Sequence, residues 1–352
     1  MPRASEAPAE NQVVKLLLIG DGKGGKTFYA GLAAEQGFNV LYLDGDVAAP
    51  TIQQLPPKAK ENIYLLPVGD RSNPTLSHDY IDFMVKFTSE SKLIWDDTNM
   101  RTADRKTDLS DSEVWTIHPG RLDHNWILVI DSWTSLVQSC MLWAAREHGV
   151  DLADTNSAQM RNVYSSSGMK LTQILVIIQR IKCNVICIAH PDEYVKQKRP
   201  EGQKMGSIAE KDMVVEWTKM IPKSSSKPHA MTMAKFFTDV AWMTSNPSGT
   251  ERQLDFRLDP SKISGGHFNE KKAIDAYSFA NLVKAIGGFV PAVNAPIDSV
   301  IEIAPRGTYE APAPAAKLTL NGGAKDSTPA KVEVAASGGS KGFAALIGNK
   351  AK

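Results

Sequence analysis

The sequence predicts an α/β protein in which a mostly parallel central sheet is flanked by helices. Short apolar runs rich in valine, isoleucine and leucine recur along the chain, as expected of strands that are buried on both faces of a sheet. Segments with helical spacing of apolar residues lie between these runs. A glycine-rich turn follows the first run directly. Alternation of strand and helix is typical of parallel sheets.

The predicted elements follow one another in a regular order. Strands are expected at residues 13–19, 39–43, 63–68, 126–130, 184–189 and 252–258. Helices are expected at residues 28–36, 75–92, 136–148 and 171–182, and the run 231–243 is expected to be helix or strand. Residues 191–228 show little apolar periodicity and are predicted to form a loop.

One main domain is predicted for residues 13–288. With 352 residues, of which 42% are hydrophobic and 22% charged, the chain can bury a sizeable core. Two short apolar pieces around a polar run predict an inserted hairpin at residues 93–124. Residues 1–12 and a tail at 289–352, rich in Ala, Pro, Gly, Ser and Lys, are predicted to be disordered because such a tail cannot bury a core.

Residues 20–27, which read GDGKGGKT, form the most informative motif. Gly20, Gly25, Lys26 and Thr27 fit the pattern G-x-x-x-x-G-K-[ST]. In this pattern, backbone N–H groups and the following helix N-terminus cradle phosphates, the lysine supplies a positive charge and the threonine contacts Mg²⁺. The residues expected to form the phosphate-binding loop are Gly20, Asp21, Gly22, Lys23, Gly24, Gly25, Lys26 and Thr27. Partition-type ATPases carry an additional lysine where this chain has Asp21, so that class is disfavoured.

Acids and a histidine follow the later predicted strands. Asp44 and Asp46 end the second strand, Asp131 follows the apolar run WILVI in a Walker B pattern, and His190 follows NVICIA. Because ligands gather at the carboxyl ends of parallel strands, we expect these side chains to face the loop. Asp131 is expected to hold Mg²⁺ together with Thr27. His190 either contacts the terminal phosphate or is a polar cap of its strand.

A basic segment lies shortly after His190. The run KQKRPEGQK carries the four cations Lys196, Lys198, Arg199 and Lys204. Two interpretations remain open: a solvated loop, or a contact site for the phosphate backbone of DNA, whose affinity would fall as salt rises. A net charge of +1 gives no global preference for nucleic acid, so any such binding must come from local patches.

Targeting and metal signals are weak. The N-terminus has no apolar signal region, and no run approaches the roughly 18 apolar residues of a membrane span, so a cytoplasmic protein without membrane contact is expected. Cys183 and Cys187 lie on one face of a predicted strand, and Cys140 stands apart. Since no further Cys/His cluster is close in sequence, buried packing is favoured over a zinc site.

The order of these motifs resembles the RecA-like P-loop ATPase core. The phosphate loop, the strand ending in DGD, WILVIDS, ICIAH and KFFTDVAWM carry this resemblance, which covers about residues 13–262. More closely, the chain resembles the phage Sak-type ATPases, a RadA-related group of single-strand annealing recombinases. The resemblance implies ATP and Mg²⁺ as cofactors, single-stranded DNA as a partner, a homo-oligomer, and annealing or strand exchange in a phage-infected host cell.

The resemblance also implies roles for single residues. The strand-end glutamate that activates water in this family falls on Asp46, whose arm is shorter, and Asp44 is the rival base. The family's polar sensor falls on His190. With Lys26 and Asp131, Asp46 and His190 complete the expected catalytic set. Basic residues that reach a neighbour's nucleotide fall nearest to Arg257 and Lys262; exposed charges at a strand edge are the alternative.

A second hypothesis is a nucleotide-gated accessory or assembly factor that hydrolyses ATP weakly. Aspartate in place of the family's glutamate favours it. Only about a dozen residues precede the first strand, so no separate N-terminal oligomerisation domain is expected. The apolar end of the tail at residues 342–348 (GFAALIG) is either a docking peptide, for a single-stranded DNA-binding protein or another replication partner, or an incidental apolar end.

Overall fold

The computed structural model of the chain describes residues 12–46, 48–68, 79–96, 113–152, 159–198, 214–245, 252–257, 259–266, 278–292, 294 and 300–305. All of them belong to the unit Met1–Tyr309. Several sequence predictions lie wholly or partly outside the described residues: the N-terminal segment up to residue 11, the start of the predicted helix at 75–78, residues 97–112 of the inserted hairpin, the basic residues Arg199 and Lys204, and the tail beyond residue 305 with its apolar end.

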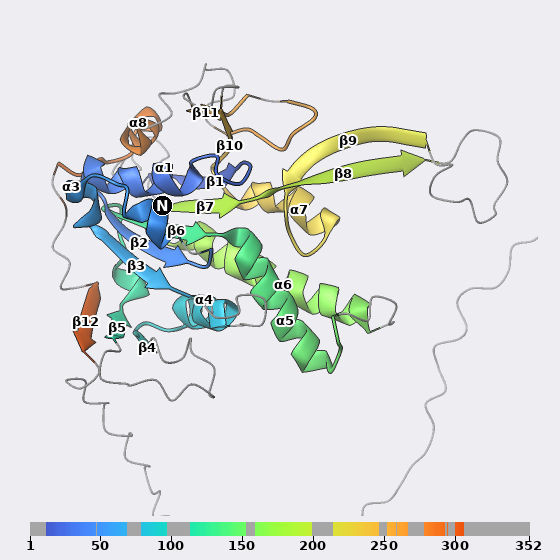
Figure 1. The fold of residues 1–352 in the computed structure, drawn as a ribbon, viewed down its shortest axis with the longest axis horizontal. Helices are drawn as coiled ribbons and strands as arrows, with labels where there is room; N and C mark the ends of the chain where they lie inside the picture. Colours follow the sequence, from blue (N-terminus) through green and yellow to red (C-terminus); the bar gives the residue numbers. More distant parts are fainter. Residues whose placement is uncertain are drawn as a thin grey trace, which may run out of the picture. The chain divides into compact units, whose positions relative to one another are not determined.

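A seven-stranded sheet forms the centre of the described unit (Figure 1). Its strand order is β11-β10-β1-β7-β6-β2-β3. Neighbouring strands are parallel except for the edge pair β10–β11, which is antiparallel. The strands are β1 (Lys15–Ile19), β2 (Asn39–Asp44), β3 (Ile63–Pro67), β6 (Trp126–Asp131), β7 (Asn184–Ala189), β10 (Asp239–Ser245) and β11 (Arg252–Asp255). The predicted mostly parallel α/β fold is confirmed.

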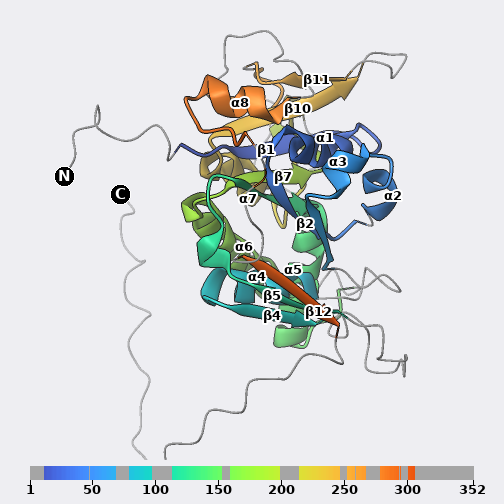
Figure 2. The ribbon, with the colours of Figure 1, turned by 90° about the vertical axis from the view of Figure 1, so that its left-hand side faces the viewer.

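Helices cover both faces of this sheet (Figure 2). One face packs against α1 (Lys26–Leu32), the 3₁₀ helix η3 (Ala33–Gln36), α2 (Ala49–Ile52), α3 (Pro57–Lys60) and α8 (Phe279–Ala285). The other face packs against α4 (Asp79–Ser89), α5 (Trp133–His148), α6 (Met160–Arg180) and α7 (Lys227–Met233). Two further 3₁₀ helices are η6 (Pro119–Arg121) and η8 (Ala234–Phe236). None of the described helices is long and apolar enough to cross a membrane.

Strand β1, an inner strand of the sheet, shows why the apolar runs are continuous rather than alternating. Leu16 and Leu18 belong to the hydrophobic cluster on one face of the sheet, and Leu17 and Ile19 belong to the cluster on the other face. All four side chains are fully buried. A strand between two helix layers must be apolar on both sides, so its sequence has no period of two.

A second, three-stranded antiparallel sheet has the order β12-β5-β4. The segment predicted to be an inserted hairpin contributes β4 (Leu93–Asp96) and β5 (Glu113–Ile117), which pair antiparallel. The third strand, β12 (Ile301–Pro305), lies inside the tail that the sequence predicts to be disordered from residue 289. Residues 301–305 therefore contradict the predicted disorder at these positions. The composition of residues 289–352 as a whole gives no sign of this short strand. Its Ile301 is buried, and its backbone pairs with β5.

Residues 191–228 are not the loop that the sequence predicts. They include a two-stranded antiparallel ribbon, β8 (Pro191–Lys198) and β9 (Val214–Pro222), and the start of α7. The ribbon extends beyond the central sheet (Figure 1). Its strands carry few buried side chains, so the apolar periodicity used to predict strands is weak, and the backbone ladder supplies the pairing instead.

Candidate active site

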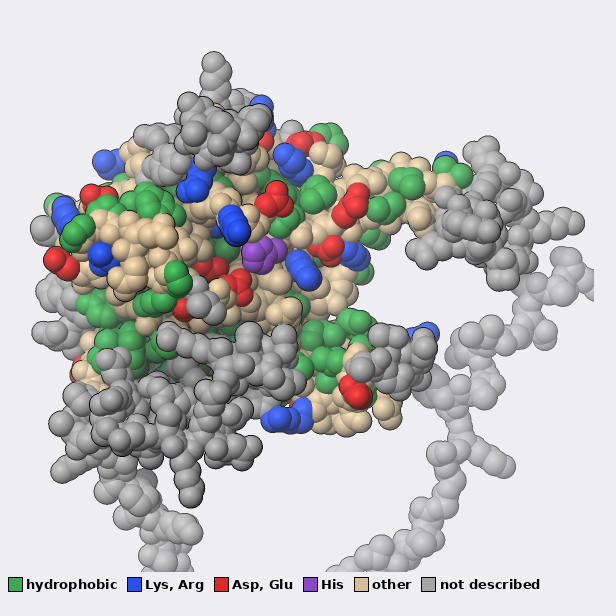
Figure 3. Space-filling model, viewed as in Figure 1, with side chains coloured by type: hydrophobic (Ala, Val, Ile, Leu, Met, Phe, Trp, Pro, Cys, Tyr) green, Lys and Arg blue, Asp and Glu red, His purple; other side chains and the backbone are tan. Residues whose placement is uncertain are grey.

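The predicted site residues meet at one edge of the sheet because their strands are parallel. All of these residues lie at the carboxyl ends of strands. The loop follows β1, the acids come at or just after the ends of β2 and β6, and the histidine follows β7. A cleft of about 520 Å³ at this edge is lined by the loop from Lys23 to Thr27 together with Asp46, Asp131 and His190. Acidic and basic side chains lie close together in the middle of this face (Figure 3). Polar side chains at this edge are typical of ligand sites in open α/β sheets.

The phosphate-loop lysine is held inside its own loop. The Lys26 Nζ donates to the backbone oxygens of Gly20 and Asp21, each at 2.7 Å, and only 5% of the residue is exposed. Burial lowers the pKa of Lys26, and the nearby carboxylates of Asp131, Asp21 and Asp46 oppose that effect. The lysine therefore lies close to carboxylates that favour its charged form.

Two glycines of the motif are required by close contacts. A Cβ on Gly20 would lie 2.8 Å from the backbone oxygen of Met243 on β10. A larger residue at this position, where the loop begins after β1, would therefore clash with the β10 backbone. Gly25 has φ 92°, in the left-handed region, and a Cβ there would lie 2.5 Å from Nη1 of Arg252. The spacing of the motif thus reflects both backbone conformation and the approach of neighbouring strands.

Asp131 and Thr27 form the part of the site that suits a hard cation. Asp131 is 3% exposed, and its Oδ2 accepts hydrogen bonds from the Thr27 hydroxyl at 2.8 Å and from the hydroxyl of Tyr42. Burial raises the pKa of Asp131 to about 6, although the hydrogen bonds from Tyr42 and Thr27 oppose this rise. Sequence reasoning missed Tyr42, because an aromatic residue in a buried strand gives no signal of a polar contact.

A magnesium ion would fit Asp131 and Thr27 chemically. Carboxylate and hydroxyl oxygens are ligands that Mg²⁺ accepts, and it usually keeps waters and takes substrate phosphates as its other ligands. Among the described residues, no group of three or more His, Cys, Asp or Glu side chains is arranged to hold a metal ion. A site with few protein ligands is thus the kind that this cleft can offer.

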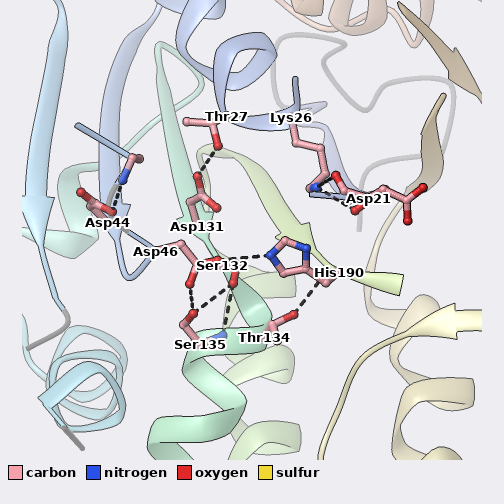
Figure 4. A network of polar contacts seen from close by, with 12 residues as sticks. Asp21, Lys26, Thr27, Asp44, Asp46, Asp131, Ser132, Thr134, Ser135 and His190 are labelled. Carbon is pink, nitrogen blue, oxygen red and sulfur yellow. Dashed lines mark hydrogen bonds and ion pairs between the residues drawn. The ribbon is translucent and has the colours of Figure 1, made fainter. Parts of the chain in front are cut away.

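Asp46 and His190 form a polar network that reaches α5 (Figure 4). The His190 Nε2 lies 3.4 Å from Asp46 Oδ2, and the Ser135 hydroxyl donates to the other carboxylate oxygen. Ser132 caps α5 by accepting from the backbone N–H of Ser135 at 3.2 Å. Burial alone would raise the pKa of Asp46, but hydrogen bonds from His190, Ser132 and Ser135 outweigh burial and hold that pKa below its usual value.

The two candidate bases after β2 have different environments. Asp44 is 4% exposed, and its Oδ1 accepts the backbone N–H of Ala48 at 2.7 Å, so its carboxylate stabilises the turn into α2. Asp46 lines the cleft, whereas Asp44 is not among the residues described as lining it. Position therefore favours Asp46 over Asp44 as the group that contacts a bound substrate.

His190 connects the cleft to the β8–β9 ribbon through its backbone. Its N–H donates to the Thr134 hydroxyl at 3.2 Å, and its carbonyl oxygen accepts from the backbone N–H of Lys223 at 2.8 Å. The ribbon starts at Pro191 and ends at Pro222, so both of its strands are anchored next to His190. A displacement of His190 would thus act on both strands of the ribbon.

One face of the ribbon combines basic and aromatic side chains. Tyr194 pairs in register with Lys219, and Lys196 with Trp217, which places all four on the same face. The rings of Tyr194 and Trp217 are 5.1 Å apart, edge to face. The Lys196 ammonium lies 5.9 Å from the Trp217 ring and 2.9 Å from Glu216. The sequence pointed to Lys196 and Lys198 but missed these aromatic partners, because it did not predict the strand pairing.

The two residues proposed to reach a neighbouring subunit are not in the cleft. The Arg257 guanidinium donates to both carboxylate oxygens of Asp255, at 2.8 and 2.9 Å. The Lys262 Nζ lies 4.0 Å from Asp259. A different cation, Arg252 at the start of β11, does line the cleft. Sequence reasoning missed it because the antiparallel return of β11 onto β10 leaves no local signal.

The cysteines are free and buried. Burial raises the pKa of Cys140 to about 12 and that of Cys183 to about 11. Thiols with such pKa values are poor nucleophiles and poor metal ligands at neutral pH, so the predicted packing role fits these environments.

No protein-family model and no curated protein matches this chain. The fold and the site together define an α/β protein with a mostly parallel seven-stranded sheet and a charged cleft at the carboxyl edge of its strands.

Proposed function

We propose that the chain is a RecA-like P-loop ATPase that binds and hydrolyses ATP with Mg²⁺ and acts with single-stranded DNA in phage recombination, by annealing or strand exchange. One observation carries the proposal: Lys26, Thr27, Asp46, Asp131 and His190 line the same cleft, although they come from separate parts of the chain. The motif order that predicts this chemistry and the arrangement of the side chains support the same function.

The strand order supports the RecA-like assignment. The phosphate-loop strand β1 and the Walker B strand β6 are not neighbours, because β7 lies between them. This order puts His190 between the loop and Asp131, where a side chain can respond to the terminal phosphate. Strand β2 lies beyond β6 and brings Asp46 next to Asp131 and His190.

The proposed chemistry assigns each side chain a separate task. The loop amides and Lys26 bind the phosphates, and Thr27 and Asp131 would hold Mg²⁺, which neutralises charge on the phosphate oxygens. Asp46 orients the attacking water and accepts its proton during in-line attack on the γ-phosphate. His190 holds the Asp46 carboxylate in place and transmits the state of the site to the ribbon.

Two substitutions test the site. Lys26→Ala should abolish ATP binding, and Asp46→Asn should leave binding intact but stop turnover. Asp44→Asn is the matched comparison, because its amide oxygen can still accept the Ala48 N–H and turnover should continue. Binding of a fluorescent ATP analogue and phosphate release measure the two steps. Full hydrolysis by the Asp46→Asn variant, with loss in Asp44→Asn, would reverse the base assignment.

The ribbon face supports the DNA part of the proposal. Aromatic side chains stack on bases of single strands, and lysines neutralise the backbone, so Tyr194, Trp217, Lys196 and Lys219 form a suitable platform. Since His190 joins the ribbon to the cleft, ATP binding should change DNA affinity. The proposed function thus couples nucleotide state to DNA binding through His190.

A salt series of single-stranded DNA binding, with and without MgATP, tests this part. Trp217→Ala should weaken binding by about 1–3 kcal/mol through loss of stacking. Thr218→Ala is the matched control, because Thr218 pairs with Val195 on the opposite face of the ribbon and should bind DNA like the wild type. A DNA affinity that changes neither with MgATP nor with Trp217→Ala would overturn the recombination proposal and leave the proposed nucleotide site untouched.

The accessory or assembly factor remains the second candidate. The observation that favours it is the Asp46 environment: a carboxylate whose pKa is held low by hydrogen bonds is a weak proton acceptor. Turnover of ATP with and without single-stranded DNA separates the two functions, since only the recombinase requires DNA stimulation or ATP-dependent DNA affinity. The homo-oligomer and the tail's replication partner stay predictions, and mass measurements with and without nucleotide address the first.

A further inference from the structure

We propose that Arg252 is a second cationic clamp of the nucleotide site and binds the phosphates of a nucleotide held by its own chain. The inference rests on the proposed function, because it needs a nucleotide in the cleft. It adds a residue that the phosphate-loop motif does not contain and that comes from the edge strand β11, two strands away from β1.

The sheet topology brings Arg252 to the site. Strand β10 runs parallel to β1, so both end at the edge where the phosphate loop lies. Strand β11 is antiparallel to β10, and its first residue, Arg252, pairs with Ser245 at the end of β10. An antiparallel strand therefore begins where the parallel strands end, and its first side chain is delivered to the carboxyl edge.

The Arg252 side chain packs directly against the loop. An ideal Cβ on Gly25 would lie 2.5 to 2.7 Å from Nη1, Cζ and Cδ of Arg252. The left-handed backbone at Gly25, with φ 92°, favours glycine, and the missing side chain leaves the space that the arginine fills. Arg252 also lines the cleft together with Lys26 and Thr27, so its guanidinium is on the side of the loop that a bound ligand would face.

The guanidinium has donor capacity to spare. Within the part of the chain that the structure describes, it makes no hydrogen bond through its side chain and no ion pair. By contrast, Lys26 donates to loop carbonyls and Arg257 to Asp255. A half-buried guanidinium offers donors in a planar fork that matches two oxygens of a phosphate group. Asp46 and Asp131 line the same cleft, so a further cation would offset their repulsion of a bound anion.

The contact with Gly25 indicates which phosphates Arg252 binds. In this loop pattern the backbone amides cradle the α- and β-phosphates, whereas the lysine reaches the β- and γ-phosphates. A guanidinium packed on Gly25 belongs to the first group. Arg252 should therefore strengthen ADP and ATP binding by the same factor, and binding of AMP, which has only the α-phosphate, by a smaller factor.

Equilibrium binding of MgATP, MgADP and AMP to purified full-length variants tests the clamp. Arg252→Ala should weaken ATP and ADP alike, by at least about tenfold, as expected for loss of a charged hydrogen bond. Arg252→Gln keeps only Cδ of the three Arg252 atoms that lie nearest Gly25, removes the positive charge and should show the same loss, and Arg252→Lys should restore part of it. Arg161→Ala, at an exposed arginine on α6, is the matched control and should bind like the wild type.

The outcomes are distinct. If the wild type binds nucleotide and Lys26→Ala does not, but both Arg252→Ala and Arg252→Gln bind normally, the clamp is wrong and the proposed function stands. Loss of ATP affinity alone would also overturn it, because the arginine would then be a γ-phosphate contact. Restored binding in a mixture of Lys26→Ala and Arg252→Ala chains would assign Arg252 to the neighbour's site. A wild type that binds neither nucleotide would overturn both proposals.

Discussion

Replacing Asp131 by asparagine should stabilise the nucleotide-free chain above neutral pH, even though it should impair the site. The carboxylate is 3% exposed, and burial raises its pKa from 3.8 to about 6. A tenfold change in proton affinity corresponds to about 1.4 kcal/mol, so keeping this group ionised in the folded chain costs about 3 kcal/mol. Asparagine avoids that cost, and its carbonyl oxygen can still accept from Tyr42 and Thr27. At high pH the free energy of unfolding of Asp131→Asn should exceed that of the wild type by at most about 3 kcal/mol.

The pH dependence has a definite sign. The folded chain binds the Asp131 proton more tightly than the unfolded chain, so the stability from this group is fully present below pH 3.8 and is lost as pH rises through 6. Between about pH 5 and about pH 8 the free energy of unfolding of the wild type should fall by about 1.4 kcal/mol relative to that of Asp131→Asn. Urea unfolding of both chains at the two pH values, without Mg²⁺ or nucleotide, measures this difference.

A second variant checks the cause. Tyr42→Phe removes a hydrogen bond that lowers the pKa of Asp131, so this pKa should rise further and the loss of stability with pH should become larger. A stability difference between wild type and Asp131→Asn that does not change with pH, or that changes in the opposite direction, would refute the assigned burial effect.

Two further predictions concern the frame of the site. Gly20→Ala should cost about 1–3 kcal/mol in urea unfolding, because its Cβ would press on the backbone oxygen of Met243, whereas Gly22→Ala, with no atom within 4 Å of the added Cβ, should be neutral. Asn184→Ala should cost about 1–3 kcal/mol, since its buried side chain accepts from the Val14 N–H at 2.9 Å and donates to the His124 carbonyl at 2.9 Å; an unchanged unfolding midpoint would contradict this role.

Local patterns were sufficient to predict the parallel sheet and the loop, acids and histidine that line its cleft. Apolar runs that are followed closely by Asp46, Asp131 or His190 predict two features together. The run predicts a buried strand, and the residue after it predicts a polar group at the carboxyl end of that strand. In a parallel sheet these ends must share one edge, so spatial proximity followed from sequence without knowledge of the strand order. The glycines of the loop were likewise predicted from their spacing.

Features that depend on antiparallel pairing or on long-range contacts were not predicted. The β8–β9 ribbon buries little surface, so its residues show no clear period, and the pairing of Lys196 with Trp217 depends on a return strand. Arg252 reaches the loop only because β11 reverses direction. The hydrogen bond from Tyr42 to Asp131 joins side chains of neighbouring strands whose register no local pattern fixes.

Strand β12 has a consequence for where the chain can be shortened. It pairs with β5, which is the middle strand of its sheet and would become an edge without it. Removing the tail at residue 289, where its composition changes, would strip this partner away and uncover a row of backbone donors and acceptors next to Val114 and Trp115. Open ladders of this kind promote association between chains. A shortened protein intended for solution work should therefore keep residues up to 305.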